Sequence, residues 1–318
     1  MERKSLNAEA TPGLARDGSV GVVVVNHERP DSTRRCLAAL GRLTHANWFL
    51  VLVDNGCADF SPEAVAAVSP RGAHLHSDSN RGFAGGSNLG MRAALERGAD
   101  WLWFLNDDAE PEPESLNELL AVAQAPPWPA IVGPKVLRGD RPEQLDSVGL
   151  EIDLASGRLR LVGHGEIDRG QYDLLTDPVA VTGCAMLVRA ETCVLLNGFE
   201  ETYFAYMEDA DLCLRARQAA RRIAFAPRAR VLHHRAPASG GRQSIESLYY
   251  STRNHLWLLH WHSPGPPWQR KVQELRVMAL GAAYALRART GAPLAALRAV
   301  RRGVRDFRRG AFGGLPPP

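Results

Sequence analysis

The alternation of short apolar runs with helix signals in the first 105 residues constrains this chain most. The apolar runs predict strands at residues 22–25, 49–53, 73–76 and 101–105. Helices are indicated between them, one after Asp31 and another where Ser61 can cap a helix that begins at Pro62. Strands that alternate with helices predict an α/β fold, with a Rossmann-like, mostly parallel sheet flanked by helices.

Polar residues stand near the end of each of these strands. Ligands of open parallel sheets sit beyond the carboxyl ends of the strands, so we expect these side chains to converge on one crevice. They are Asn26, Asp54, Asn80, Asp107 and Asp108.

A glycine-rich segment, residues 80–90, lies between the third and fourth predicted strands. Glycines let the backbone approach a ligand, and the helix that they open offers free N–H groups to an anion such as a nucleotide diphosphate. The alternative is a turn without a ligand. The segment has no G-x-G-x-x-G pattern, which argues against a dehydrogenase. The expected contacts to a nucleotide sugar are Asn80, Gly82, Gly85, Gly86 and Asn88.

Asp107 and Asp108 directly follow the fourth predicted strand. Paired carboxylates at such a place can hold a divalent cation, Mg²⁺ or Mn²⁺, against a diphosphate. We assign the cation to Asp108 and expect Asp107 to face the ribose. The alternative is that both acids cap a helix expected after Pro111.

Asp54 follows the second predicted strand. A carboxylate there can accept the imide N–H of uracil or thymine, a donor that cytosine lacks at the corresponding ring nitrogen. This favours uridine or thymidine diphosphate sugars. The alternative is an Asx turn over residues 54–56, which needs no ligand, and both can hold together.

Charge is unevenly distributed along the chain. Residues 264–318 contain eleven Lys or Arg against two acids, a net charge of +9, which leaves −6 on the first 263 residues. A basic extension on an acidic body seeks anionic partners. We favour an anionic membrane surface over nucleic acid, because the extension contains an amphipathic helix. Its apolar face is Leu294, Leu297, Val300, Val304 and Phe307. The alternative is a helix that packs on the rest of the protein with a solvated basic face.

The expected organisation is a disordered tail at 1–19, one domain at 20–263, the basic helical extension at 264–312 and a disordered tail at 313–318. In the second half of the domain, the residue pattern predicts strands at 131–137, 150–162 and 179–188, and helices at 208–217 and 248–262. Five scattered cysteines indicate neither a disulfide framework nor a zinc site and favour the cytoplasm. No apolar run approaches the roughly 18 residues of a membrane span, so membrane contact would be peripheral, on the inner face of the cell membrane.

Six motifs, taken in order, resemble those of the inverting family 2 glycosyltransferases, which have the GT-A fold. They lie at residues 22–26, 53–56, 80–88, 105–108, 182–183 and 206–212, and the resemblance covers roughly residues 20–260. Within this family the chain is most similar to bacterial rhamnosyltransferases, which use thymidine diphosphate rhamnose to build cell-surface polysaccharide. The sequence departs from the pattern at Cys57, where serine is usual, and at Asp107, which makes the cation motif Asn-Asp-Asp.

The resemblance implies roles for residues in the second half of the chain. Asp209 matches the general base that removes the acceptor proton, and His234 matches a histidine that reaches the metal or diphosphate, with His233 the alternative. Glu208, Arg253 and Asn254 are weaker candidates for acceptor or phosphate contacts. Acids near a helix start are favoured by the helix dipole in any case, and the alternative for Arg253 and Asn254 is a solvated helix end.

The function implied is that of a hexosyltransferase that depends on a nucleotide-diphosphate sugar and a metal. The expected donor is dTDP-rhamnose, and the expected acceptor is a polyprenyl-linked or growing glycan. The alternatives are a family 2 transferase that uses a UDP-sugar (galactose, galactofuranose or N-acetylglucosamine) and a non-catalytic scaffold of the same fold that is recruited to the membrane.

Overall fold

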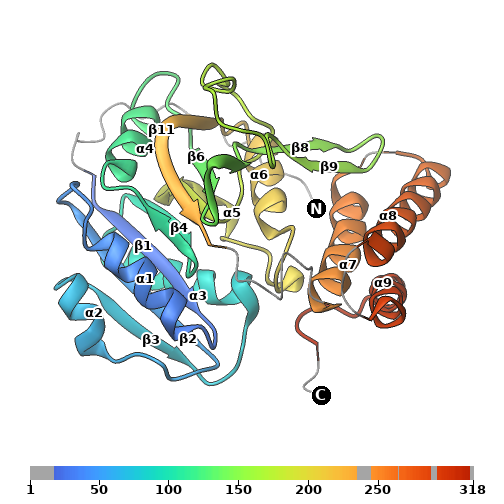
Figure 1. The fold of residues 1–318 in the computed structure, drawn as a ribbon, viewed down its shortest axis with the longest axis horizontal. Helices are drawn as coiled ribbons and strands as arrows, with labels where there is room; N and C mark the ends of the chain where they lie inside the picture. The colour runs from blue at the N-terminus through green and yellow to red at the C-terminus, as the bar shows by residue number, and fades with distance from the viewer. Residues whose placement is uncertain (1–17, 235–244, 264, 288–291, 316–318) are drawn as a thin grey trace, which may run out of the picture.

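A mixed β-sheet runs through the centre of the protein (Figure 1). The computed structural model describes residues 18–234, 245–263, 265–287 and 292–315, and within them the sheet has nine strands in the order β3–β2–β1–β4–β10–β6–β11–β5, with β7 paired to β6. The strands are β1 (Val20–Asn26), β2 (Trp48–Asn55), β3 (Ala73–Ser77), β4 (Trp101–Asn106), β5 (Ala109–Pro111), β6 (Ile131–Arg138), β7 (Arg141–Ser147), β10 (Ala185–Arg189) and β11 (Ile223–His233). A separate hairpin is formed by β8 (Leu150–Asp153) and β9 (Arg158–Leu161).

The first four strands are parallel, so their carboxyl ends meet at one edge, where Asn26 pairs in register with Asp54. The helices that connect them are α1 (Pro30–Leu40), α2 (Pro62–Val68) and α3 (Gly82–Glu96). Ser61 caps α2 as predicted, whereas α1 begins one residue before Asp31, with a proline in its first turn. The predicted α/β architecture and its four leading strands are confirmed, whereas the sheet as a whole is mixed, because β10 pairs antiparallel with β4 and β6, β5 with β11, and β7 with β6.

Apolar side chains form a core on each face of the sheet. One core joins α1, α2 and α4 (Ser115–Ala123) to the sheet, and the other joins α3, α5 (Ala190–Leu196) and α6 (Glu208–Gln218). The strands between the two cores are buried on both faces, which explains their continuous apolar sequence.

The strand predicted at 179–188 is shorter in the structure. Only Ala185–Arg189 is a strand, and the preceding segment leaves the sheet. Its Gly183 N–H donates to the Asp209 carboxylate (2.8 Å), and its Ala180 makes an isolated bridge to Leu150. The sequence could not reveal this, because the partner lies on a distant helix.

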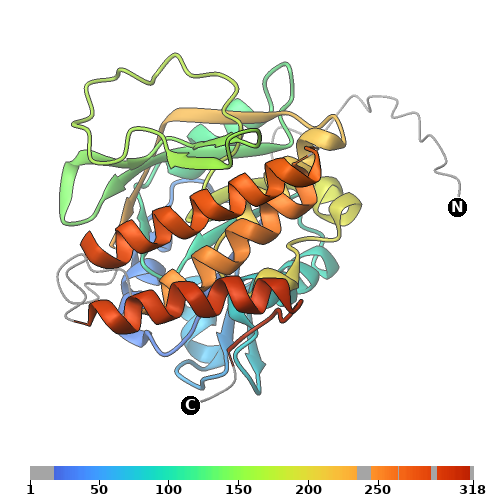
Figure 2. The ribbon, with the colours of Figure 1, turned by 90° about the vertical axis from the view of Figure 1, so that its right-hand side faces the viewer.

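Three helices cover one end of the domain, and Figure 2 shows them face-on. They are α7 (Ile245–His262), α8 (Pro267–Arg287) and α9 (Pro293–Arg308). The apolar face of α9 packs on α7 and α8, with Val300 and Val304 buried, and Gly303 approaches the Tyr249 carbonyl so closely that an added Cβ would lie 2.8 Å from it. Most of the face expected to enter a bilayer is thus used for packing inside the protein, as the alternative proposed, while Leu294 at the start of α9 is 70% exposed.

The C-terminal segment expected to be disordered is docked where the structure describes it. The Gly313 carbonyl accepts a hydrogen bond from Arg253 (2.7 Å), and the Leu315 N–H donates to the Tyr250 hydroxyl (2.7 Å). Residues 1–17 and 316–318 of the two expected tails lie outside the described residues. None of the described helices combines the length and the apolar character needed to cross a bilayer.

Candidate active site

The ends of β1 and β2 form a fully bonded polar cluster. Asn26 donates to Oδ1 of Asp54 (2.8 Å), while Oδ2 of Asp54 accepts the N–H groups of Asp59 (3.1 Å) and Phe60 (3.0 Å) and contacts His74 Nε2 (3.0 Å). Asn26 and Asp54 are both 0% exposed. The Asx turn expected over residues 54–56 is not formed, because the Gly56 N–H donates to the Ser77 carbonyl (3.0 Å), and the Asp54 carboxylate instead holds a turn at residues 59 and 60. The role of Asp54 in reading the base stays a prediction, and in this state its oxygens are occupied by the protein.

The glycines of the 80–90 segment open a helix, as predicted, but they face protein. A Cβ at Gly86 would lie 2.7 Å from Val25 Cγ1, and Gly82, with φ +69°, is in contact with Phe204. Of the first amides of α3, that of Ala84 donates to the Phe204 carbonyl (3.1 Å). Gly85 lies against Arg81. Close packing of α3 thus gives Gly82 and Gly86 a structural reason of their own, and their expected contacts to a nucleotide sugar stay a prediction.

The two asparagines of this segment differ in position. Asn88 is buried and binds the backbone of Phe199 with both ends of its amide, at 2.8 and 2.9 Å, so it clamps α3 to the chain before α6. This is a structural role, and the expected donor contact of Asn88 stays a prediction. Asn80 is exposed and donates to His27 Nε2 (2.8 Å), so its side chain remains accessible at the edge of the sheet.

The acidic pair after β4 lies between cationic groups. Asp108 Oδ1 lies 3.2 Å from His233 Nε2, and Oδ2 lies 3.3 Å from Arg29 Nη1, which also approaches Asp107 Oδ1 at 3.7 Å. The capping alternative is wrong, because β5 follows at once and α4 begins only at Ser115.

Burial and neighbouring charges shift the pKa values of the two acids in opposite directions. Burial, followed by the adjacent charge of Asp108, raises the pKa of Asp107 to about 7. Burial also acts to raise the pKa of Asp108, but the His233 ring and the Arg29 guanidinium outweigh it and hold that pKa below its ordinary value. Asp108 is thus the acid that keeps its negative charge, as a metal ligand must.

His233, the last residue of β11, and His234, which follows it, contact different acids. His233 bridges Asp108 and Asp146 (Nδ1 to Oδ2, 2.8 Å), whereas His234 Nε2 lies 3.1 Å from Glu110 Oε1 and only its backbone N–H reaches Asp108. The histidine considered as the alternative is therefore the one whose ring contacts Asp108. The sequence analysis missed Arg29, Glu110 and Asp146. Arg29 could have been found, because it stands three residues after Asn26 at a strand end.

The residues around Asp108 fit a divalent cation. Asp108 Oδ1 and His234 Nε2 are both buried atoms that make no hydrogen bond in the described structure, since neither ring contact has the required geometry. A buried oxygen without a hydrogen bond is costly, and a bound Mg²⁺ or Mn²⁺ would satisfy it.

A second group of possible ligand atoms lies within 4.8 Å of one another, on Asp54, Cys57 and Asp59. It fits a metal less well. The Asp54 oxygens are already bonded, and burial above all raises the pKa of the Cys57 thiol, so it is not held as the thiolate that binds metals.

The start of α6 presents two acids with few donors. Asp209 accepts the N–H of Gly183 on Oδ2 (2.8 Å) and that of Ala210 on Oδ1 (2.8 Å). Glu208 is buried, and its Oε2 has no hydrogen-bond partner among the described residues. Burial raises the pKa of both carboxyl groups, and for Glu208 the Asp209 charge adds to the effect.

A strained loop precedes these acids. Phe204, Tyr206 and Met207 have φ of +66°, +70° and +74°, a region that non-glycine residues seldom adopt and that is concentrated at functional sites. Tyr206 is 48% exposed, whereas Tyr203 is buried.

Arg253 and Asn254 hold this loop. Asn254 Nδ2 donates to the carbonyls of Tyr203, Ala205 and Tyr206 at 2.8, 2.7 and 2.9 Å, and Arg253 Nη2 donates to that of Tyr203 at 3.0 Å. Arg253 is 1% exposed. The alternative of a solvated helix end is wrong, because both side chains are buried in this clamp on the loop, and the expected acceptor or phosphate contact stays a prediction.

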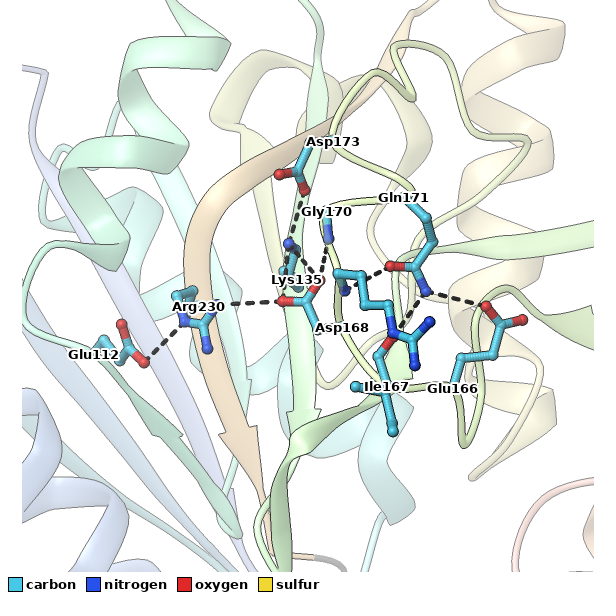
Figure 3. A network of polar contacts seen from close by, with 10 residues as sticks. Glu112, Lys135, Glu166, Ile167, Asp168, Gly170, Gln171, Asp173 and Arg230 are labelled. Atoms are coloured by element: carbon cyan, nitrogen blue, oxygen red, sulfur yellow. Dashed lines mark hydrogen bonds and ion pairs between the residues drawn. The ribbon is translucent and has the colours of Figure 1, made fainter.

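A second polar network secures residues 163–178 over β6 and β11 (Figure 3). Lys135, which is buried, contacts Asp168 (3.0 Å) and Asp173 (2.8 Å), and Arg230 joins Asp168 (3.4 Å) to Glu112 (3.1 Å). The opposite charges in this network are paired with one another, so it stabilises the loop and presents no reactive group.

Comparison with known proteins decides the family. A family model described as glycosyl transferase family 2 matches residues 21–190. The chain belongs to this family. It is 27% identical over 259 residues to an N-acetylglucosaminyl-diphospho-decaprenol L-rhamnosyltransferase of Mycobacterium tuberculosis, covering 76% of this chain and 84% of the relative. It is also 42% identical over 131 residues to galactofuranosyltransferase GlfT1 of the same organism, covering 40% and 42% of the two chains.

Solved structures agree on the fold. The mannosyltransferase PcManGT of Pyrobaculum calidifontis, in complex with GDP-Man and Mn²⁺, superposes with a TM-score of 0.54 at 15% identity, covering 92% of this chain and 87% of that one. The GT-A fold and the glycosyltransferase class are therefore confirmed.

Proposed function

We propose that this glycosyltransferase transfers a sugar with inversion, in a metal-dependent reaction, from a nucleotide diphosphate to a lipid-linked or growing cell-surface glycan. The observation that carries the proposal is a two-residue bridge between the two acidic centres. Gly183 N–H binds Asp209, and the carbonyl of the next residue, Cys184, accepts the N–H of Asn106 (2.9 Å), which precedes the Asp107–Asp108 pair. The segments that carry the proposed cation ligand and the proposed base are therefore joined by two consecutive residues, which supports their action at one site.

The chemistry assigns each group a task. A bound Mg²⁺ or Mn²⁺ at Asp108 would offset the charge that develops on the departing diphosphate. Asp209 would accept the proton of the acceptor hydroxyl as it attacks the anomeric carbon from the face opposite the diphosphate, which inverts the configuration. The amide of Gly183 fixes the Asp209 carboxylate, and His233 and Arg29 keep Asp108 ionised.

For the donor, dTDP-rhamnose is the first candidate, because the relative that matches over most of both chains is named a rhamnosyltransferase. A UDP-sugar, galactofuranose first, is the second candidate, supported by the higher identity to GlfT1 over a shorter stretch. We retain Asn80 and Asp107 as donor contacts. Asn26 and Asp54 shape the site by building the turn over residues 56–60.

We also propose that the enzyme works at the inner face of the cell membrane as a peripheral, cytoplasmic protein. The rhamnosyltransferase relative is named for a decaprenol-linked acceptor, and an acceptor of that kind stays in the bilayer. No nucleic-acid partner is proposed.

The test is Asp108→Asn, with Asp78→Asn, a fully exposed aspartate of the same half, as the matched control. Titration of dTDP and UDP by calorimetry, with and without Mn²⁺, should show metal-dependent binding in the parent and the control. The Asp108 variant should lose the metal-dependent part, and its turnover should fall by about 10²–10³. Unchanged metal-dependent affinity would refute the site. A parent protein that binds no nucleotide and hydrolyses no donor would favour the scaffold alternative.

A further inference from the structure

The outer face of α8 carries an exposed apolar stripe. Trp268, Leu275 and Leu286 are 67%, 65% and 67% exposed, and Val272 and Ala279 lie between them on the same face of the helix. The spacings of three, four and seven residues keep all five on one side. A soluble protein seldom leaves such a stripe in contact with water without a use for it.

The opposite face of α8 fixes the orientation of the stripe. Val277 is buried in a cluster with Leu256 and Leu259 of α7, and Gln273 donates to the Leu154 carbonyl of the β8–β9 turn (2.7 Å). The stripe lies about half a turn away from these anchors. In the described residues the stripe therefore faces away from α7 and the β8–β9 turn, on a helix that Figure 2 shows at the surface of the molecule.

A row of exposed arginines on α9 runs beside the stripe. Its members are Arg298, Arg301, Arg302, Arg305 and Arg308. Contact between Arg308 and Glu274, and packing of Gly281 on Val300, place α8 and α9 side by side in opposite directions (Figure 2). Lys271 of α8 adds a further exposed positive charge.

We propose that this α8–α9 outer face, the apolar stripe of α8 with the arginine row of α9, docks the enzyme on an anionic lipid bilayer. The stripe would enter the acyl boundary, Trp268 would sit at the headgroup level, and the arginines would contact lipid phosphates. A second copy of the chain fits the face less well, because two such faces would bring their arginine rows together.

This docking surface replaces the buried apolar face of α9 as the source of membrane affinity. It rests on the proposed membrane location, and it orients the enzyme with α7, α8 and α9 toward the lipid. Donor and metal chemistry play no part in it, so the two proposals can fail separately.

The experiment measures cosedimentation of the full chain with vesicles of phosphatidylcholine alone or mixed with phosphatidylglycerol. One variant carries Leu275→Ser and Leu286→Ser, and another carries Arg298→Gln and Arg301→Gln. The matched controls are Leu174→Ser and Arg160→Gln, which change exposed residues elsewhere. We expect the parent and the controls to bind the anionic vesicles and not the neutral ones. Each double variant should bind about tenfold more weakly or worse, and the arginine variant should also show a weaker salt dependence than the parent.

Metal-dependent nucleotide binding should be unchanged in every variant, which shows that each one folds. The proposal would be overturned if the parent did not bind anionic vesicles, or if the leucine variant bound them as tightly as the parent does. Light scattering supplies the remaining outcome: a parent dimer that the leucine variant converts to a monomer would assign the face to self-association and also overturn it.

Discussion

Asp54 at the end of β2 and Glu208 at the start of α6 are both buried carboxylates, and they differ in the number of donors around them. Asp54 is bonded by Asn26 and by two backbone amides, and it contacts His74. Among the described residues, Glu208 Oε2 has no hydrogen-bond partner. A satisfied carboxylate stabilises the fold, whereas an unsatisfied one raises the energy of the native state and is available for a ligand.

The same contrast separates the regions that contain them. The β2 end is built as a closed turn. At the start of α6 the backbone is strained, and both Glu208 and Asp108 have an oxygen that makes no hydrogen bond among the described residues. These features lower the stability of the native state, and the rest of the structure must compensate for them. We therefore expect substitutions at the β2 end to change stability, and substitutions at α6 to change turnover more than stability.

The largest expected effect is that of Asp209→Asn. The amide keeps the shape of the side chain but cannot take a proton, so turnover should fall by about 10²–10⁴ while donor affinity stays nearly constant. Steady-state kinetics together with nucleotide titration separates the two quantities. In the parent, turnover should rise with pH through the pKa of Asp209, which burial places above its ordinary value of 3.8.

Normal turnover in Asp209→Asn would exclude it as the base. Equal losses of turnover and donor affinity would instead point to a structural role at the start of α6. The pH profile gives an independent check, because the variant that lacks the base should also lack the rise with pH.

Asp54→Asn should give the next largest effect, a loss of stability of about 3 kcal/mol, because the new amide group turns a donor toward buried donors. For a chain of this size the melting temperature should fall by roughly 5 °C or more. Asp78→Asn, on the exposed segment after β3, should leave it unchanged. Thermal denaturation checks both.

The same variant sharpens the question of base recognition. If Asp54 only builds the turn, affinity for UDP, dTDP and CDP should change in parallel. If it also reads the base, the preference for UDP and dTDP over CDP should disappear in the variant. An Asp54→Asn protein as stable as the parent would contradict the bonding that distinguishes Asp54 from Glu208.

Strand ends were predictable from the sequence, and long-range partners were not. Alternating apolar runs fixed where β1, β2 and β4 stop, and hence which polar residues share an edge. By contrast, Asn88 and Asn254 resemble ligand contacts in sequence, yet each binds backbone more than 45 residues away. Nothing in the local pattern distinguishes an amide that meets a loop from one that meets a ligand.

Hydrophobic periodicity shows the same limit at the C-terminus. It identified the apolar face of α9 correctly but could not reveal that α7 covers it. The apolar stripe of α8 is less regular in sequence, because small residues interrupt it, and the structure leaves it exposed. Periodicity predicts that a face is apolar, while the packing of neighbours decides whether it meets protein or solvent.

The smallest expected effect, and the one opposite in sign to that of Asp54→Asn, is a gain in stability for Glu208→Gln. Because burial raises the pKa of Glu208 well above its ordinary value of 4.5, the native state keeps a proton that the unfolded chain has lost. Stability of the parent should therefore fall as pH rises from about 4.5 to the raised pKa and stay low above it. Glutamine has no such dependence, so the variant should match the parent near pH 4.5 and exceed it by about 1 kcal/mol at pH 8. Urea denaturation at the two pH values measures this difference. A variant that is less stable than the parent at pH 8 would mean that the Glu208 carboxylate gains more from the folded protein than burial costs it, and the contrast with Asp54 would be lost.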